Sequence, residues 1–260
     1  MQKEIQKFSN SEIMEGMSSI SSLIDAMEHS ELQNDRRILR VMIDAAKKRS
    51  KAREISFLNA KARSLGFSVE YLDASEIDAL AVGTTHGGIL AECTPRNLPK
   101  LSADAILADG IYYYLEGVED PYNFGYAVRS LYAAGADGVV IPPRNWMGAA
   151  GVVARSSAGC SERIPMLVAD TPDAIACFHS LGYTVICAGI RDSVSLWDID
   201  LQKPLLVILG GEKRGISKAA LEASDHIVRI DYGTEFRGSL STSAAAAVFG
   251  FEILRQNRKR

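Results

Sequence analysis

The chain has few cysteines and histidines, and neither type is spaced as in a common metal or disulfide motif. Its four cysteines form no C-x-x-C pair, and its four histidines form no H-E-x-x-H pattern. This excludes the usual zinc signatures and a disulfide framework. We therefore predict no metal cofactor, and we expect a reducing, cytoplasmic location.

Long apolar runs and a strong charge imbalance are also missing. No stretch approaches the roughly 18 to 20 apolar residues that span a bilayer, and the N-terminus lacks the apolar core of a signal peptide. We expect no membrane partner. The formal net charge of the 260 residues is −3, so a nucleic acid would have to be bound by a local basic patch.

The apolar pattern predicts two α/β domains. Residues 94–104 (TPRNLPKLSAD) carry two prolines in an apolar-poor stretch, which is typical of a linker. We place the domains at 1–100 and 101–260. The elements expected in the first domain are helices at 17–28 and 55–65 and strands at 38–44, 67–72 and 88–92.

The second domain alternates between short apolar strands and helices of about a dozen residues. The strands are rich in Val, Ile and Leu without polar alternation, which predicts a parallel sheet covered on both faces. The expected strands are 105–110, 138–142, 166–170, 184–189, 205–210 and 226–230, and the expected helices are 121–135, 148–158, 172–182, 216–224 and 239–256.

One predicted strand runs into a glycine-rich segment, GGEKRGIS (210–217), that resembles two phosphate-binding loops and matches neither. In the register of a Walker loop, Ile216 stands where the lysine belongs. In the G-x-G-x-x-G fingerprint, Glu212 replaces the second glycine, and its carboxylate would repel a pyrophosphate. We therefore expect a ligand that is uncharged at its recognised edge or carries a cation.

Two other segments have features of functional loops. Residues 120–121 (DP) predict a capped helix start, and this helix carries Asn123 and Arg129. Two positions separated by six residues point about 120° apart around a helix. Asn123 and Arg129 therefore converge only if Asn123 sits in the first turn or just before it. A simple cap and a surface arginine remain an alternative. The strand at 226–230 leaves through a glycine-containing loop toward a helix starting near Ser239.

Taken in order, residues 120–135, 205–217 and 239–247 resemble the three signature motifs of the SpoU (TrmH) branch of the SPOUT RNA 2′-O-ribose methyltransferases. Residues 154–166 (ARSSAGCSERIPM) resemble a further family segment, and the first domain resembles the family's substrate-binding domain, a small ribosomal-protein-like α/β unit. The resemblance implies a SPOUT domain whose deep trefoil knot forms a pocket for S-adenosylmethionine. It also implies a homodimer with shared active sites and rRNA or tRNA as substrate.

Carried over by position, the resemblance implies two sets of site residues. The cofactor-binding set is Ala188, Gly189, Leu209, Gly210, Gly211, Ile230 and Leu240, and the catalytic set is Asn123, Arg129, Glu212, Ser239 and Ser241. Because a guanidinium keeps its proton in proteins, we expect Arg129 to clamp the target's phosphate rather than to act as a base. The chain departs from the family at Ser241, where the third motif usually has asparagine.

A basic block in the first domain is the candidate RNA contact. We expect RNA to be bound by Arg36, Arg37, Lys47, Lys48, Arg49, Lys51 and Arg53. A solvated helix face is the alternative for this block. At the level of function, a catalytically weak RNA-binding paralogue and an unrelated nucleotide enzyme are the alternatives to a methyltransferase.

Overall fold

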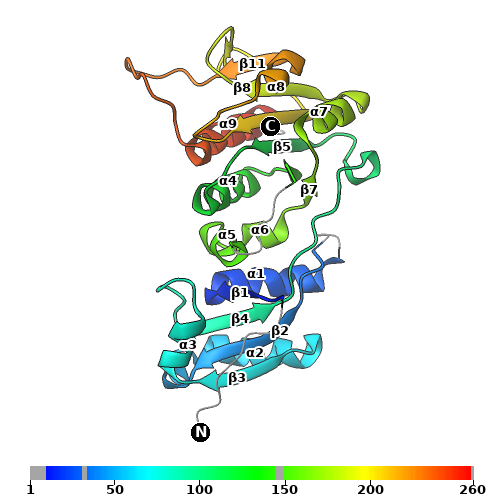
Figure 1. Cartoon of the computed structure of the whole chain (residues 1–260). Helices are drawn as coiled ribbons and strands as arrows, with labels where there is room; N and C mark the ends of the chain where they lie inside the picture. The colour runs from blue at the N-terminus through cyan, green and yellow to red at the C-terminus, as the bar shows by residue number, and fades with distance from the viewer. Residues whose placement is uncertain (1–9, 31–33, 144–148, 259–260) are drawn as a thin grey trace. The chain divides into compact units, whose positions relative to one another are not determined.

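A computed structural model describes residues 10–30, 34–143 and 149–258 of the chain (Figure 1). The chain divides into two compact units. Unit 1 comprises residues 1–97 together with 145–163, and unit 2 comprises residues 98–144 together with 164–260. A segment between two strands of unit 2 therefore packs with unit 1.

Unit 1 is built on a four-stranded sheet in the order β1-β4-β2-β3. β4 is antiparallel to both β1 and β2, whereas β3 is parallel to β2. The unit comprises β1 (Glu12–Glu15), α1 (Gly16–Glu28), β2 (Ile38–Asp44), η2 (Ala45–Lys47), α2 (Ala52–Leu65), β3 (Ser68–Leu72), α3 (Ala74–Leu80), β4 (Ile89–Cys93), α5 (Ala150–Ser156) and α6 (Cys160–Arg163). The elements expected from the sequence are present, and β1, η2, α3 and α6 are additional.

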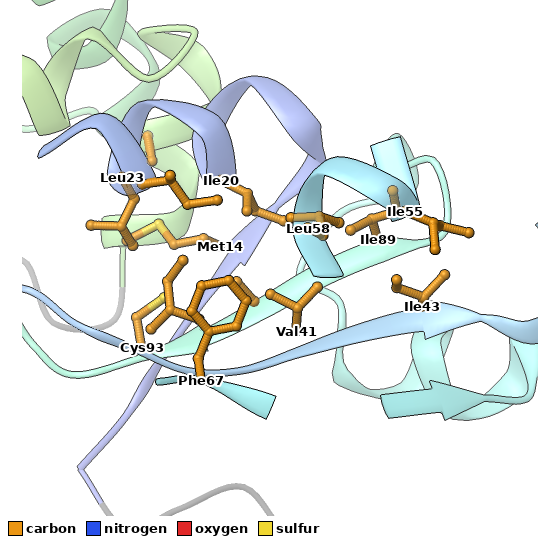
Figure 2. Close-up of a cluster of buried hydrophobic side chains, with 14 residues drawn as sticks. Met14, Ile20, Leu23, Val41, Ile43, Ile55, Leu58, Phe67, Ile89 and Cys93 are labelled. Atoms are coloured by element: carbon orange, nitrogen blue, oxygen red, sulfur yellow. The ribbon is translucent and has the colours of Figure 1, made fainter. Parts of the chain in front are cut away.

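The core of unit 1 lies between the sheet and its helices. Figure 2 shows Ile20 of α1 and Leu58 of α2 close to Val41 of β2 and to Phe67. Ala154 of α5 belongs to the same buried cluster. The segment that contains α5 is thus part of the hydrophobic core of unit 1.

Unit 2 is a seven-stranded sheet in the order β7-β6-β5-β10-β8-β11-β9. Every pair of neighbouring strands is parallel, as the sequence predicts. Its elements are η3 (Ala103–Ala105), β5 (Ile111–Glu116), α4 (Pro121–Ala133), β6 (Gly138–Ile141), β7 (Met166–Val168), α7 (Thr171–Ser180), β8 (Thr184–Ala188), β9 (Val194–Ser195), β10 (Leu205–Gly210), α8 (Lys218–Ala223), β11 (His226–Arg229) and α9 (Thr242–Asn257).

Helices cover both faces of this sheet. On β5, Tyr112 faces Phe178 of α7, with ring centroids 5.3 Å apart. On the other face α9 packs against β10 and α4, and Gly250 of α9 brings its backbone close to the Tyr113 hydroxyl and to Ala134. Two-sided burial explains why the strands lack polar alternation.

Two boundaries differ from the prediction. The strand expected at 105–110 is wrong: these residues form a short 3₁₀ turn and a loop, and the strand is 111–116. The true strand carries three buried tyrosines (Tyr112, Tyr113 and Tyr114), which aliphatic periodicity undervalues although tyrosine favours strands. The last helix starts at Thr242 rather than near Ser239, because Ser241 is its N-cap.

Two further expectations bear on the fold. The trefoil knot implied by the family resemblance stays a prediction. Within the ranges that the structure describes, no helix combines the length and apolar character that crossing a bilayer requires.

Candidate active site

A cavity of about 400 Å³ lies where β8, β10 and β11 end. This is the edge at which open parallel sheets bind their ligands. All the predicted cofactor-binding residues line it, namely Ala188, Gly189, Leu209, Gly210, Gly211, Ile230 and Leu240. Ser239 and Glu212 line it as well. Loops that are far apart in sequence therefore meet around one space.

The glycines of this cavity are required by close backbone approach. A Cβ on Gly210 would lie 2.5 Å from the carbonyl carbon of Gly215 and 2.7 Å from the nitrogen of Ile216. A Cβ on Gly211 would lie 2.1 Å from the carbonyl oxygen of Gly117. The glycine-rich segment thus folds back on itself and packs onto Gly117, the residue after β5.

A second cavity, of about 340 Å³, shares Glu212 and Thr242 with the first and is also lined by Asn123. The Asn123 side-chain amide donates to Glu212 Oε1 at 2.8 Å. Asn123 lies in the first turn of α4, whose cap is Asp120, as predicted. The first and second predicted motifs therefore meet at one hydrogen bond.

The other two predicted catalytic residues lie elsewhere. Arg129 is exposed on α4 and lines neither cavity, and we find no hydrogen-bond or ionic partner for it among the described residues. The Ser241 hydroxyl accepts from the Ala244 backbone N–H at 3.2 Å and contacts the Ser243 hydroxyl at 3.0 Å. Ser241 therefore caps α9 and also lines neither cavity.

Two family models match the chain. Residues 110–251 match the SpoU rRNA Methylase family, and residues 30–99 match a model described as RNA 2′-O ribose methyltransferase substrate binding. The chain belongs to the SpoU family. The predicted family is thereby confirmed, as is the α/β fold class with its parallel sheet and N-terminal substrate-binding domain.

Relatives of this SpoU-family chain include a Burkholderia protein named 23S rRNA (guanosine-2′-O-)-methyltransferase RlmB. It is 31% identical over 224 residues, which cover 85% of this chain and 89% of the relative. A Staphylococcus saprophyticus protein named putative TrmH family tRNA/rRNA methyltransferase is 28% identical, with 84% and 88% covered. A crystal structure of an AdoMet-bound rRNA methyltransferase from Sinorhizobium meliloti shares the fold, with a TM-score of 0.77, 21% identity, and 96% and 89% covered.

The lining of the first cavity suits a SpoU-family cofactor. Many of its lining residues are apolar, and its polar features are backbone groups of the glycine loops, the carboxylate of Glu212, two guanidinium groups and three hydroxyls (Arg191, Arg229, Tyr232, Ser239 and Thr242). The Arg229 guanidinium is paired with Asp231. Such walls can hold an adenosine by apolar contact and main-chain hydrogen bonds, and a carboxylate complements a sulfonium. The sequence analysis did not assign Ile216, Tyr232, Thr242 and Phe249 to the cofactor site, although they also line this cavity. Ile216 lies in the glycine-rich segment and Tyr232 in the loop after the strand at 226–230, which could have marked them, whereas Thr242 and Phe249 lie within the predicted last helix and have no local signal.

The thiol of Cys187, the residue before the cavity-lining Ala188, is not an activated nucleophile. Burial raises the pKa of the Cys187 thiol to about 11, so the thiol is protonated at neutral pH. In the described part of the chain, no three His, Cys, Asp or Glu side chains are grouped so that they could hold a metal ion.

The basic block of unit 1 divides into exposed and buried residues. Lys47, Lys48 and Arg49, which we name the basic loop surface, are all exposed, and Lys48 Nζ lies 4.0 Å from the centroid of the Tyr71 ring. Nearby along the chain, Arg37 and Arg53 are exposed and Lys51 is half-buried.

Arg36 is not available to a ligand, which corrects its prediction as an RNA contact. The residue is only 4% exposed. Its guanidinium pairs with the carboxylate of Glu12 and donates from Nε to Glu162 Oε2 at 3.1 Å and from Nη1 to the carbonyl of Thr94 at 3.0 Å. Arg36 therefore belongs to a buried ion network inside unit 1.

Proposed function

We propose that this protein transfers a methyl group from S-adenosylmethionine to the ribose 2′-hydroxyl of a guanosine in 23S rRNA. Membership in the SpoU family makes the chain an S-adenosylmethionine-dependent RNA 2′-O-ribose methyltransferase. The guanosine and the rRNA are the finer part of the proposal, supported by the name of the Burkholderia relative. The observation that carries it is the cavity lined by every predicted cofactor residue, next to the Asn123–Glu212 pair.

The chain's own residues account for how the target hydroxyl is positioned near the methyl group. When bound, S-adenosylmethionine supplies an electrophilic methyl group on a cationic sulfur. We propose that Glu212, held by Asn123 at 2.8 Å, uses its other oxygen to accept from a target hydroxyl and that Ser239 lines the cofactor side. A reacting oxygen has to be held at about 3 to 3.5 Å from the methyl carbon, and this fixed pair at the junction of the two cavities can define that position.

In a homodimer, Arg129 of one subunit could reach the cavities of the other subunit. Arg129 lies on α4 with two exposed tyrosines, Tyr122 (43%) and Tyr126 (47%), and α9, which packs on α4, exposes Phe251 (51%). Exposed aromatics of this kind favour a protein interface. We propose that Arg129 of one subunit binds the phosphate of the nucleotide held at the partner's cavities.

The two domains have separate roles in this proposal. We propose that residues 1–100 bind RNA and residues 101–260 carry the chemistry, with residues 149–163 serving the first unit structurally, and that the protein acts in the cytoplasm. The test is to incubate full-length protein with methyl-labelled S-adenosylmethionine and 23S rRNA from cells lacking the gene, and then to digest the RNA. We expect labelled 2′-O-methylguanosine; label in another nucleoside or RNA would overturn the finer proposal.

The basic loop surface gives a prediction about RNA affinity. Replacing Lys47, Lys48 and Arg49 by alanine is expected to weaken RNA binding at least tenfold and to flatten the salt dependence of log Kd by about 2, because each lost phosphate contact removes about 0.7. Fluorescence anisotropy at several salt concentrations measures both quantities. Lys203→Ala, in unit 2, is the control and should change neither; an unchanged salt slope in the triple variant would exclude this surface as an RNA contact.

A second candidate function follows from the position of Ser241. Because its hydroxyl caps α9 and lines neither cavity, the protein could bind RNA without transferring methyl groups. Asparagine also caps helices well, so Ser241→Asn should change the unfolding free energy by less than about 0.5 kcal/mol. We expect this variant and the wild type to methylate RNA at rates within about tenfold of each other; activity in the variant alone would favour the second candidate.

A further inference from the structure

The segment 211–217, which carries Glu212, is fastened at both ends by a single residue outside it. At its start, the Gly211 backbone N–H donates to the carbonyl of Glu116 at 2.7 Å. At its end, the Ser217 backbone N–H donates to Glu116 Oε2 at 2.9 Å. Glu116 is the last residue of β5, the strand next to β10, so the loop is tied across two neighbouring strands.

The second oxygen of the same carboxylate is also engaged. Glu116 Oε1 accepts from the Thr171 hydroxyl at 2.8 Å, at the first residue of α7. Within the loop, the Gly215 N–H donates to the carbonyl of Gly211 at 2.9 Å. The carboxylate therefore contacts both the end of the loop, at Ser217, and the start of α7, at Thr171.

The loop held in this way supplies a large part of the cofactor cavity. Gly211, Glu212, Gly215 and Ile216 all line it. None of the hydrogen bonds made by the Glu116 side chain involves the cavity directly, and Glu116 does not line it.

We infer that Glu116 is a positioning residue that holds the 211–217 loop in its cofactor-binding shape before the cofactor arrives. The inference rests on the proposed use of this cavity for S-adenosylmethionine. A loop that is already ordered loses less conformational entropy on binding, so affinity is higher than for the same contacts on a mobile loop. Removing the carboxylate leaves the contact residues in place but loosens the end of the loop.

The test measures affinity for S-adenosylhomocysteine by calorimetry in full-length variants. Glu116→Ala is expected to bind about tenfold more weakly, the usual effect of losing a hydrogen bond to a charged group. Glu116→Gln keeps an acceptor at the same reach and should lie within about threefold of wild type. Thr171→Val is the matched control: it removes the bond to the same carboxylate on the other side and should stay within about twofold.

A second readout needs no ligand. Hydrogen exchange of the 210–217 amides in cofactor-free protein should be faster in Glu116→Ala than in wild type and unchanged in Thr171→Val. If Glu116→Ala does not fold, Glu116→Asp takes its place, because its shorter side chain cannot span the same distance to Ser217.

The outcomes separate this inference from the proposed function. Wild-type affinity and wild-type exchange in the folded variant would overturn the role of Glu116 alone. Wild-type protein that does not bind S-adenosylhomocysteine would instead overturn the proposed use of the cavity. Equal losses in Glu116→Ala and Thr171→Val would show that the carboxylate supports the fold in general rather than the loop.

Discussion

Replacing Arg129 by alanine is expected to lower the rate of methyl transfer to RNA by about 10²- to 10³-fold, while affinity for S-adenosylhomocysteine stays unchanged. A guanidinium can bind a phosphate through two charge-assisted hydrogen bonds, which fixes both the position and the orientation of the nucleotide. Arg129 lines neither cavity of its own chain, so its loss should not disturb the cofactor. Single-turnover rates with labelled S-adenosylmethionine, together with calorimetry, measure the two effects.

Controls and subunit mixing make this prediction specific. Ser130→Ala, at the neighbouring position, should keep wild-type activity, whereas Arg129→Lys should recover little because lysine lacks the planar fork. If Arg129 acts on the partner's site, mixing inactive Arg129→Ala and inactive Glu212→Ala chains should restore activity in the mixed dimers. A mixture as inactive as its components would contradict an arginine shared between subunits.

Replacing Glu162 by alanine is expected to destabilise the protein by about 3 to 5 kcal/mol, the usual effect of removing one partner from a buried ion pair. Glu162 is 3% exposed and accepts from Arg36 Nε and from the Asn34 side chain. Among the residues that the structure describes, its loss leaves the buried Arg36 with Glu12 as its one acidic partner. Urea unfolding at pH 7 measures the change, and Glu222→Ala, which breaks an exposed pair with Lys218, should cost less than about 0.5 kcal/mol.

The same network makes stability depend on pH in a defined direction. Burial alone would raise the pKa of Glu162, but Arg36, Arg96 and the Asn34 hydrogen bond outweigh it and hold the pKa below its usual 4.5. A pKa that is lower in the folded state stabilises the protein above the unfolded value, and this stabilisation is lost as the pH falls. We therefore expect the unfolding free energy of the wild type to decline below about pH 4.5, and to decline less steeply in Glu162→Gln. Parallel profiles for the two proteins would contradict this role.

The cofactor cavity could be predicted in large part because its residues sit at fixed places relative to parallel strands. Once the strands at 184–189, 205–210 and 226–230 are recognised, their carboxyl ends have to meet at one edge of the sheet. The family motifs then indicate which loop residues lie there, and the seven predicted cofactor-binding residues all line one cavity, whereas Ser241 of the third motif does not. The Asn123–Glu212 contact follows similarly, since Asn123 lies in the first turn of its helix.

Long-range pairing was beyond prediction from local sequence. Arg36 looks like one more cation in a basic block, yet its partners Glu12 and Glu162 lie 24 and 126 residues away. In the structure Asn34, Arg36 and Ile38 are buried while the residues between them are exposed, which is the period of a strand facing a core, but residues 34–37 are all polar in sequence and show no apolar alternation. Counting basic residues along the chain cannot show which of them are buried.

The packing of residues 149–163 with unit 1 was equally hidden. Their sequence position, between β6 and β7, predicts a place on the sheet of unit 2. Only the structure shows how closely two glycines of this segment pack against unit 1. A Cβ on Gly151 would lie 2.1 Å from the Ile13 carbonyl oxygen, and one on Gly159 would lie 2.2 Å from Ser22 Oγ. Close contacts of this kind depend on which surfaces meet, and periodicity within a segment does not encode that.

The most direct test of the proposed methyl transfer is calorimetric titration of the full-length protein with S-adenosylhomocysteine, with ATP and NAD as comparison ligands. The cavity at the ends of β8, β10 and β11 should bind S-adenosylhomocysteine with a stoichiometry of one per chain and should bind neither ATP nor NAD tightly. Folded protein that gives no heat with S-adenosylhomocysteine, or that binds ATP or NAD instead, would contradict the assignment of this cavity to a methyl donor.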